Sequence, residues 1–197
     1  MASTSLTTGR ANGATVLLIT DMISAWDFPD AEKLVPGARS IAPAIARLKK
    51  RCDHAGIPVI YANDNRGRWR SDFALQVRAS IEAGEPGTSI TQALIPTDND
   101  YFILKPSQSA FLATPLDLLL RHLKAERVLI TGVASDQCIL ATALGARMKS
   151  FEVVIPKDCV ATQGVARNRA VLKQFEEVHR IPTTASSQIR LVPRRHR

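Results

Sequence analysis

Hydrophobic and polar positions follow one another in blocks that predict strands separated by helices. Residues 15–20, "TVLLIT", form a continuous apolar run rich in β-branched side chains, a pattern typical of a strand buried on both faces. Comparable runs follow further along the chain, and they predict the remaining strands. These runs are 58–64 "PVIYAND", 101–105 "YFILK", 127–133 "RVLITGV", 151–156 "FEVVIP" and a short sixth candidate, 181–185 "IPTTA".

Between these runs, apolar residues recur at intervals of three and four, which predicts amphipathic helices. The clearest case is 36–55, where the apolar face ends at Cys52 and Gly56 follows as a stop signal. The stretch 63–100 is mostly polar and irregular, with one short helix expected near 72–83. Further helices are predicted over 116–124, 136–149 and 165–180.

The alternation of strands and helices predicts an α/β fold with three layers, α/β/α, around a mostly parallel sheet of about six strands. We expect one domain over residues 14–192, preceded by a disordered leader (1–13) and followed by a basic, flexible tail (193–197). In open parallel sheets, ligands bind beyond the carboxyl ends of the strands. The residues at those ends are therefore the candidates for function.

Composition narrows the class of protein. The chain has 197 residues, of which 45% are hydrophobic and 22% charged, as in ordinary globular proteins. It contains no run of 18 apolar residues, so we expect no membrane association. Three cysteines do not suggest a disulfide framework and favour a reducing, cytoplasmic location.

The net charge of +8 raises the question of nucleic-acid binding. More than half of that charge comes from five arginines near the ends of the chain: Arg10 and the four in 190–197, "RLVPRRHR". A flexible, solvated end explains this cluster, so we expect no nucleic-acid partner.

Cys138 follows a predicted strand and lies in the first turn of a predicted helix, which Asp136 is expected to cap. Backbone N–H groups there carry a partial positive charge, so we expect a lowered thiol pKa and a site for an oxyanion. Position alone leaves open that Cys138 is a small buried hydrophobe. Cys52 is expected in the core, and Cys159 at the edge of the site.

Asp21 and Lys105 each close an apolar strand. Taken singly, each fits a surface charge at a strand end. Together with Cys138, they would place a carboxylate, an ammonium and a thiol at one edge of the sheet. The carboxylate can accept the thiol proton, the ammonium can hold both anions, and the sulfur can attack a carbonyl.

These residues lie in motifs that resemble the isochorismatase-like cysteine hydrolase family: "LLITDM", "ILKPSQSAF" and, most specifically, "TGVASDQCILATA". The resemblance covers about residues 14–192 and implies a Rossmann-like hydrolase fold. It implies that Asp21 is general base and then acid, that Lys105 stabilises the charges, and that Cys138 is the nucleophile. It further implies a cis peptide bond between Val133 and Ala134, with the N–H groups of Ala134 and Cys138 directed at the oxyanion.

The activity implied by the resemblance is hydrolysis of a C–N bond in a small amide, carbamoyl or ureido compound through a thioester on Cys138. Isochorismatases proper cleave a vinyl ether and lack the cysteine, so Cys138 argues against that reaction. The alternative is a catalytically inactive module that binds a small molecule or a partner on the same fold. Ile23 and Ser107 keep this alternative open, because many members carry Gln and Arg there.

Family members that bind a metal carry an Asp-x-His pair after the second strand. In this chain Arg66 stands at the place of the second ligand after Asp64, and one carboxylate is too few for a zinc-type site. We therefore expect no metal and no other cofactor. By resemblance, we expect a homo-oligomer, either a dimer or a tetramer, that acts on a small-molecule substrate.

The walls of the pocket are predicted from aromatic and polar residues near the strand ends, with Arg68 or Arg70 as a clamp for an anion. Plain packing and a solvated loop explain the same residues equally well. The residues expected to line the pocket are Trp26, Phe28, Asp64, Trp69 and Ser109.

Overall fold

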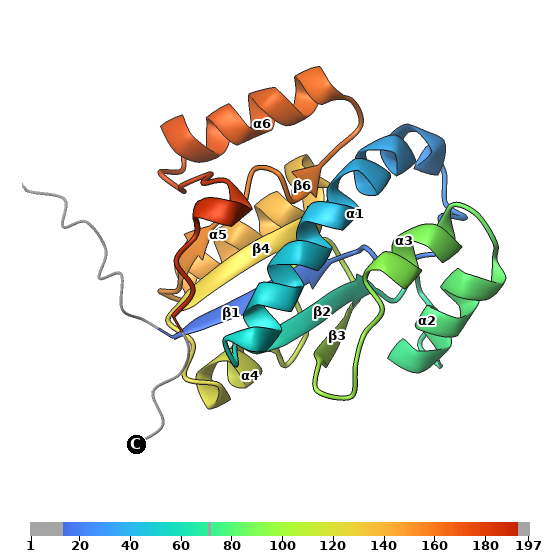
Figure 1. The fold of residues 1–197 in the computed structure, drawn as a ribbon, viewed down its shortest axis with the longest axis horizontal. Helices are drawn as coiled ribbons and strands as arrows, with labels where there is room; N and C mark the ends of the chain where they lie inside the picture. The colour runs from blue at the N-terminus through green and yellow to red at the C-terminus, as the bar shows by residue number, and fades with distance from the viewer. Residues whose placement is uncertain (1–13, 71, 193–197) are drawn as a thin grey trace, which may run out of the picture.

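The computed structural model describes residues 14–70 and 72–192, so the predicted leader and tail lie outside the described residues. Its core is a six-stranded, parallel sheet in the order β3-β2-β1-β4-β5, with β6 also paired to β4 (Figure 1). The strands are β1 (Thr15–Thr20), β2 (Val59–Asp64), β3 (Tyr101–Lys105), β4 (Arg127–Val133), β5 (Glu152–Val154) and β6 (Val160–Ala161).

Helices cover both faces of the sheet, which confirms the three-layer α/β/α prediction. Alternate residues of β1 explain why: Leu17 and Ile19 face one hydrophobic core, whereas Val16 and Leu18 face the other. The first face is covered by α1 (Ala31–His54), α2 (Phe73–Glu82) and α3 (Gly87–Ala93). The second is covered by α4 (Leu116–His122), η1 (Ser135–Ile139), α5 (Leu140–Met148) and α6 (Val165–Glu177).

Strand β1 lies in the middle of the sheet, and the chain winds outward from it in both directions. It first builds β2 and β3 on one side and then returns to build β4 on the other, as Figure 1 shows. The crevice between the carboxyl ends of β1 and β4 is the switch point at which ligands bind in such sheets. Thr20 pairs with Gly132 there, so the segments that carry Asp21 and Cys138 leave the sheet side by side.

The predicted sixth strand, 181–185, is wrong. The sixth strand is Val160–Ala161, which pairs with Gly132 and Val133, whereas β5 pairs only with the first half of β4. Because β4 is longer than β5, the last residues of β4 are not paired with β5 and can pair with another segment. Residues 181–185 adopt no regular structure, and Ile155 N–H donates to the Pro182 carbonyl at 3.0 Å.

Two helix predictions also need correction, and one helix was not predicted. Helix α1 begins at Ala31 rather than at Pro36. Leu34 is buried, and the stabilisation from its packing outweighs the cost of placing Pro36 inside the helix. The predicted helix 136–149 consists of a π-helical turn, η1, followed by α5. Helix α3 was not predicted, since its sequence "GTSITQA" carries little apolar periodicity.

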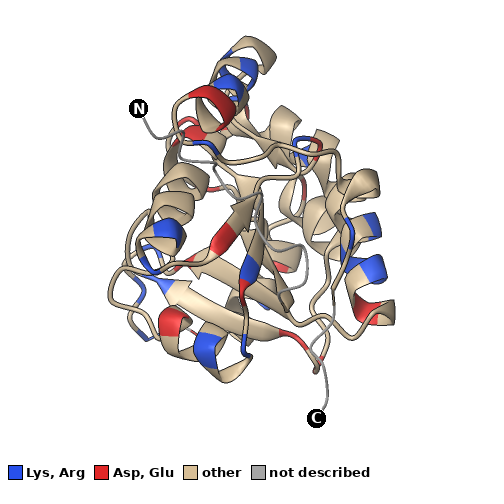
Figure 2. Ribbon diagram, turned by 90° about the vertical axis from the view of Figure 1, so that its left-hand side faces the viewer, with Lys and Arg blue, Asp and Glu red and all other residues tan. Residues whose placement is uncertain are grey.

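Charged residues concentrate on the outer helices and loops, and few lie on the strands (Figure 2). In the part of the chain that the structure describes, no helix combines the length and the apolar character that a membrane crossing requires.

Candidate active site

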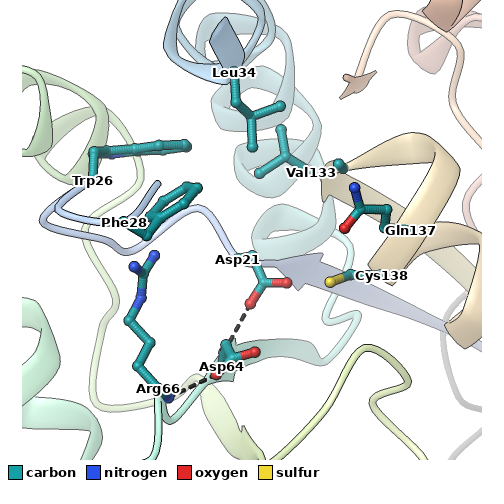
Figure 3. A pocket seen from close by; sticks show the side chains of 10 residues that line it. Asp21, Trp26, Phe28, Leu34, Asp64, Arg66, Val133, Gln137 and Cys138 are labelled. Carbon is teal, nitrogen blue, oxygen red and sulfur yellow. Dashed lines mark hydrogen bonds between the residues drawn. The ribbon is translucent and has the colours of Figure 1, made fainter. Parts of the chain in front are cut away.

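Asp21, Lys105 and Cys138 meet at the carboxyl edge of the sheet. The Lys105 Nζ lies 2.9 Å from Asp21 Oδ2 and 3.4 Å from Cys138 Sγ. Figure 3 shows the Asp21 carboxylate and the Cys138 sulfur turned toward each other. The three side chains therefore have the spatial arrangement that the sequence predicted.

Each of the three residues is brought to this point by a different segment. Asp21 directly follows β1 with a left-handed backbone (φ 54°), and its Oδ1 accepts a hydrogen bond of 2.8 Å from Asp64 N–H at the end of β2. Lys105 ends β3, two strands away from β1, and its side chain is long enough for the ammonium to reach Asp21. Cys138 lies in η1, directly after β4.

Lys105 is completely buried, and its ammonium is surrounded by acceptors. Besides Asp21 and Cys138, it donates to the Ser107 carbonyl at 3.2 Å and lies 3.5 Å from Asp64 Oδ2. Burial by itself would lower the pKa of Lys105, but the interactions of its ammonium with Asp21 and with the Cys138 sulfur outweigh that effect and raise the pKa. Lys105 is therefore a fixed cation.

The expected lowering of the thiol pKa is wrong. Burial of Cys138 raises its pKa to about 12, and the neighbouring Asp21 carboxylate adds to the effect, while Lys105 opposes it. Burial also raises the pKa of Asp21. The resting site therefore keeps a proton on the thiol, next to a carboxylate whose basicity is increased by the same burial.

A pocket of about 280 Å³ opens above these residues. Figure 3 shows its shape: Asp21 and Cys138 lie at its floor, while Trp26 and Phe28 form the opposite wall. The peptide bond between Val133 and Ala134, which also lines the pocket, is cis, as the resemblance implied. The lining residues are Asp21, Trp26, Phe28, Leu34, Asp64, Arg66, Val133, Ala134, Gln137 and Cys138.

Two of the predicted pocket residues lie elsewhere. Trp69 is 77% exposed and belongs to the outer part of its loop. The Ser109 hydroxyl accepts a hydrogen bond from Phe111 N–H and lies near Gly145 of α5. Neither residue lines the pocket, because position in the chain fixes a loop residue's neighbourhood but not the direction of its side chain.

The sequence interpretation missed Arg66, Leu34 and Gln137 as lining residues. Arg66 was considered only as a replacement for a metal ligand, and the anion clamp was assigned to Arg68 or Arg70 instead. Leu34 could have been found had the first helix been predicted to begin earlier. Gln137 directly precedes Cys138, which is a signal that the sequence did contain.

Three further expectations concern residues near the site. Asp136 does not cap a helix: its carboxylate accepts from the Thr162 hydroxyl at 2.5 Å and pairs with Arg167. Cys52 lies in the core, as predicted. Cys159 is completely buried and does not line the pocket, and burial raises its pKa to about 12.

The chain is similar to known proteins over most of its length. The model of the isochorismatase domain matches residues 15–187. The uncharacterized isochorismatase family protein YaaI of Bacillus subtilis (strain 168) is 36% identical over 88% of this chain and 94% of its own length. N-carbamoylsarcosine amidase of an Arthrobacter species is 27% identical over 77% of this chain and 61% of its own length.

Solved structures show the same fold. A crystal structure of an isochorismatase family protein from Desulfovibrio vulgaris superposes with a TM-score of 0.72 at 24% identity, covering 89% of this chain and 96% of the other. At that level of identity, the likeness concerns the fold alone.

Proposed function

This chain belongs to the isochorismatase-like family, and on that premise we propose that it is a cysteine amidohydrolase. Its substrate is a small amide, carbamoyl or ureido compound, whose C–N bond it hydrolyses through a thioester on Cys138. The observation that carries the proposal is that the buried Lys105 Nζ lies 2.9 Å from Asp21 and 3.4 Å from Cys138, two residues that line one pocket.

In the first step, the Cys138 sulfur attacks the substrate carbonyl carbon while Asp21 accepts the thiol proton. The raised pKa of Asp21 favours this transfer, because a more basic carboxylate holds the proton more strongly. An S–C bond forms and the carbonyl oxygen becomes negatively charged. The backbone N–H groups of Ala134 and Cys138 stabilise that oxyanion by hydrogen bonding.

In the second step, Asp21 returns the proton to the departing nitrogen, and the C–N bond breaks. Ammonia or an amine leaves, and the acyl group remains on Cys138 as a thioester. A water molecule then gives a proton to Asp21 and adds to the thioester carbon. When the C–S bond breaks, the sulfur recovers that proton and the acid product leaves.

Lys105 stabilises the negative charge wherever it lies in this cycle. The charge begins on Asp21 and moves to the substrate oxygen as the sulfur attacks. Because Lys105 Nζ contacts both Asp21 and Cys138, it does not need to move while the proton changes position. A preorganised, buried cation of this kind costs no reorganisation during the reaction.

A screen for ammonia release across small amides, carbamoyl compounds and ureido compounds tests the proposal. We expect turnover by the wild-type protein and a loss of at least about 1,000-fold in kcat in Cys138→Ser, since the hydroxyl is a far weaker nucleophile. Cys159→Ser, which changes a buried cysteine outside the pocket, is the matched control. Equal activity of wild type and Cys138→Ser on every substrate would overturn the proposal.

A further inference from the structure

The pocket has one cationic side chain on its wall, and its surroundings indicate what kind of substrate it recognises. Of the ten described residues that line the pocket, only Arg66 is positively charged. Asp21 and Asp64, by contrast, lie around the Lys105 ammonium, which contacts the Cys138 sulfur. The pocket is therefore acidic where the reaction takes place and basic on the side of Phe28.

Arg66 is held in place from several sides. Its backbone N–H donates to Asp64 Oδ1 at 2.6 Å, and its guanidinium Cζ lies 4.2 Å from the centre of the Phe28 ring. Its NH2 group donates to the Ser24 hydroxyl at 2.8 Å. As Figure 3 shows, the side chain extends along the pocket wall and ends beneath Phe28.

The only acid that pairs with the guanidinium in the described structure does so weakly. Asp27 Oδ1 lies 3.4 Å from Arg66 NH1, its side chain is half exposed, and it also pairs with Arg68 at 3.3 Å. A guanidinium has five N–H donors, and the contacts to Ser24 and Asp27 engage two of its nitrogens. Arg66 can therefore still bind a carboxylate from the pocket side, through an N–H that neither Ser24 nor Asp27 accepts.

Trp26 contributes an apolar surface to the same wall. It is 6% exposed, its ring packs against Phe28 at 6.0 Å, and its Nε1 has no acceptor among the described residues. That N–H is itself covered by its neighbours, so a ligand in the pocket does not reach it, and Arg66 is the charged donor on this wall.

On the basis of the proposed amidohydrolase function, we propose that the substrate carries a carboxylate and that Arg66 is the residue that selects for it. The carboxamide or ureido carbonyl lies at Cys138, and the carboxylate lies at Arg66, on the wall that Phe28 and Trp26 form. The volume of about 280 Å³ restricts the substrate to a short acid, with few atoms between the two groups.

The test compares matched pairs of substrates that differ only in charge: succinamate with succinamide, and N-carbamoylglycine with its neutral carboxamide. We expect wild type to prefer the acid of each pair in kcat/KM. Arg66→Gln should lower that preference by about tenfold to a hundredfold, the effect of losing a charge-assisted hydrogen bond. Arg68→Gln is the matched control, since Arg68 also pairs with Asp27 but does not line the pocket.

A binding experiment separates this inference from the proposed function. Calorimetric titration of Cys138→Ser with the same pairs measures recognition without turnover, and circular dichroism verifies that each variant is folded. Tighter binding of the acids, lost in Arg66→Gln and kept in Arg68→Gln, supports the carboxylate site even if no compound is hydrolysed. Equal binding of acid and amide, no binding of either, or an unchanged preference in Arg66→Gln would overturn it.

Discussion

Cys138 illustrates how strongly the surroundings of one residue determine its chemistry. Its position after a strand, at the start of a helical turn, suggested an acidic thiol. In the folded protein, burial and the nearby Asp21 carboxylate instead raise its pKa to about 12, although Lys105 lies 3.4 Å away. The thiol therefore loses its proton only as it attacks, and Asp21 is the group that accepts it.

The pH dependence of alkylation tests this electrostatic balance. We expect the rate of iodoacetamide reaction at Cys138 to rise with a midpoint far above that of an ordinary thiol, about 8.5. Removing the carboxylate in Asp21→Asn should shift the midpoint down, because a repelling negative charge is lost. Removing the ammonium in Lys105→Met should shift it up, because an attracting positive charge is lost.

Peptide mapping by mass spectrometry measures the alkylation rate at each cysteine. Cys52 and Cys159 are fully buried and serve as internal controls that should stay unlabelled while the protein is folded. An upward shift of the midpoint in Asp21→Asn, a downward shift in Lys105→Met, or no shift in either variant would contradict the charge effects assigned to Asp21 and Lys105.

At the scale of elements, the site depends on the close approach of β1 and β4. Gly132 has a left-handed backbone (φ 109°), and a Cβ atom there would lie 2.0 Å from the Thr20 carbonyl oxygen. Only glycine allows the two strands to pair at this point. Asp21 and the segment leading to Cys138 begin within two residues of that contact, so strand pairing sets their relative position.

We therefore expect Gly132→Ala to lower the free energy of unfolding by about 3–5 kcal/mol and to abolish activity. Gly84→Ala is the matched control: it also has a positive φ (79°), but nothing lies within 4 Å of the added Cβ, so it should cost only about 1 kcal/mol. Urea titrations followed by circular dichroism measure both values. Similar losses in the two variants would refute the role assigned to the β1–β4 contact.

Two side-chain contacts connect the π-helical turn that carries Cys138 to α6: the ion pair of Asp136 with Arg167 and a partly buried hydrogen bond from Ser135. Ser135 donates to Asn168 Oδ1 at 2.7 Å, and Asn168 donates to the Val160 carbonyl at 3.2 Å. Since Ser135 begins η1, this contact connects the nucleophile's turn to the helix that packs behind it. Asn168 is thus a positioning residue and does not touch the reacting atoms.

A double-mutant cycle with Ser135→Ala and Asn168→Ala should give a coupling energy of about 1 kcal/mol in the free energy of unfolding. We also expect Asn168→Ala to lower kcat more than it raises KM, because the turn loses support while the pocket wall stays intact. A cycle of Asn168→Ala with Thr88→Ala, a residue that shares no partner with Asn168, should be additive. A coupling energy near zero in the first cycle would contradict the proposed connection.

At the scale of the whole molecule, the expectation of a homo-oligomer remains a prediction. The edge strand β3 leaves Phe102 52% exposed, and on α4 Leu118 is 73% exposed. Exposed apolar side chains near an unpaired edge are often covered by a neighbouring chain. Light scattering after size-exclusion chromatography should give two or four times the chain mass of 21.5 kDa. A mass of one chain across a wide range of concentration would show that the prediction is wrong.

The sequence by itself determined the fold class and the residues that meet at the site. Five of the six strand positions follow from apolar runs, because the strands of a parallel sheet covered on both faces are mostly apolar. Asp21, Lys105 and Cys138 could be found because each ends or follows such a run, and parallel strands bring their carboxyl ends to one edge.

Only the tertiary structure decided the properties that depend on distance and direction. The sixth strand is Val160–Ala161, because the open end of β4 determines which segment pairs there. Arg66 lines the pocket while Trp69 points outward, because loop backbone and packing set side-chain direction. The pKa of the Cys138 thiol depends on its burial and on charges from distant segments of the chain. Both arise from three-dimensional contacts that no local sequence pattern encodes.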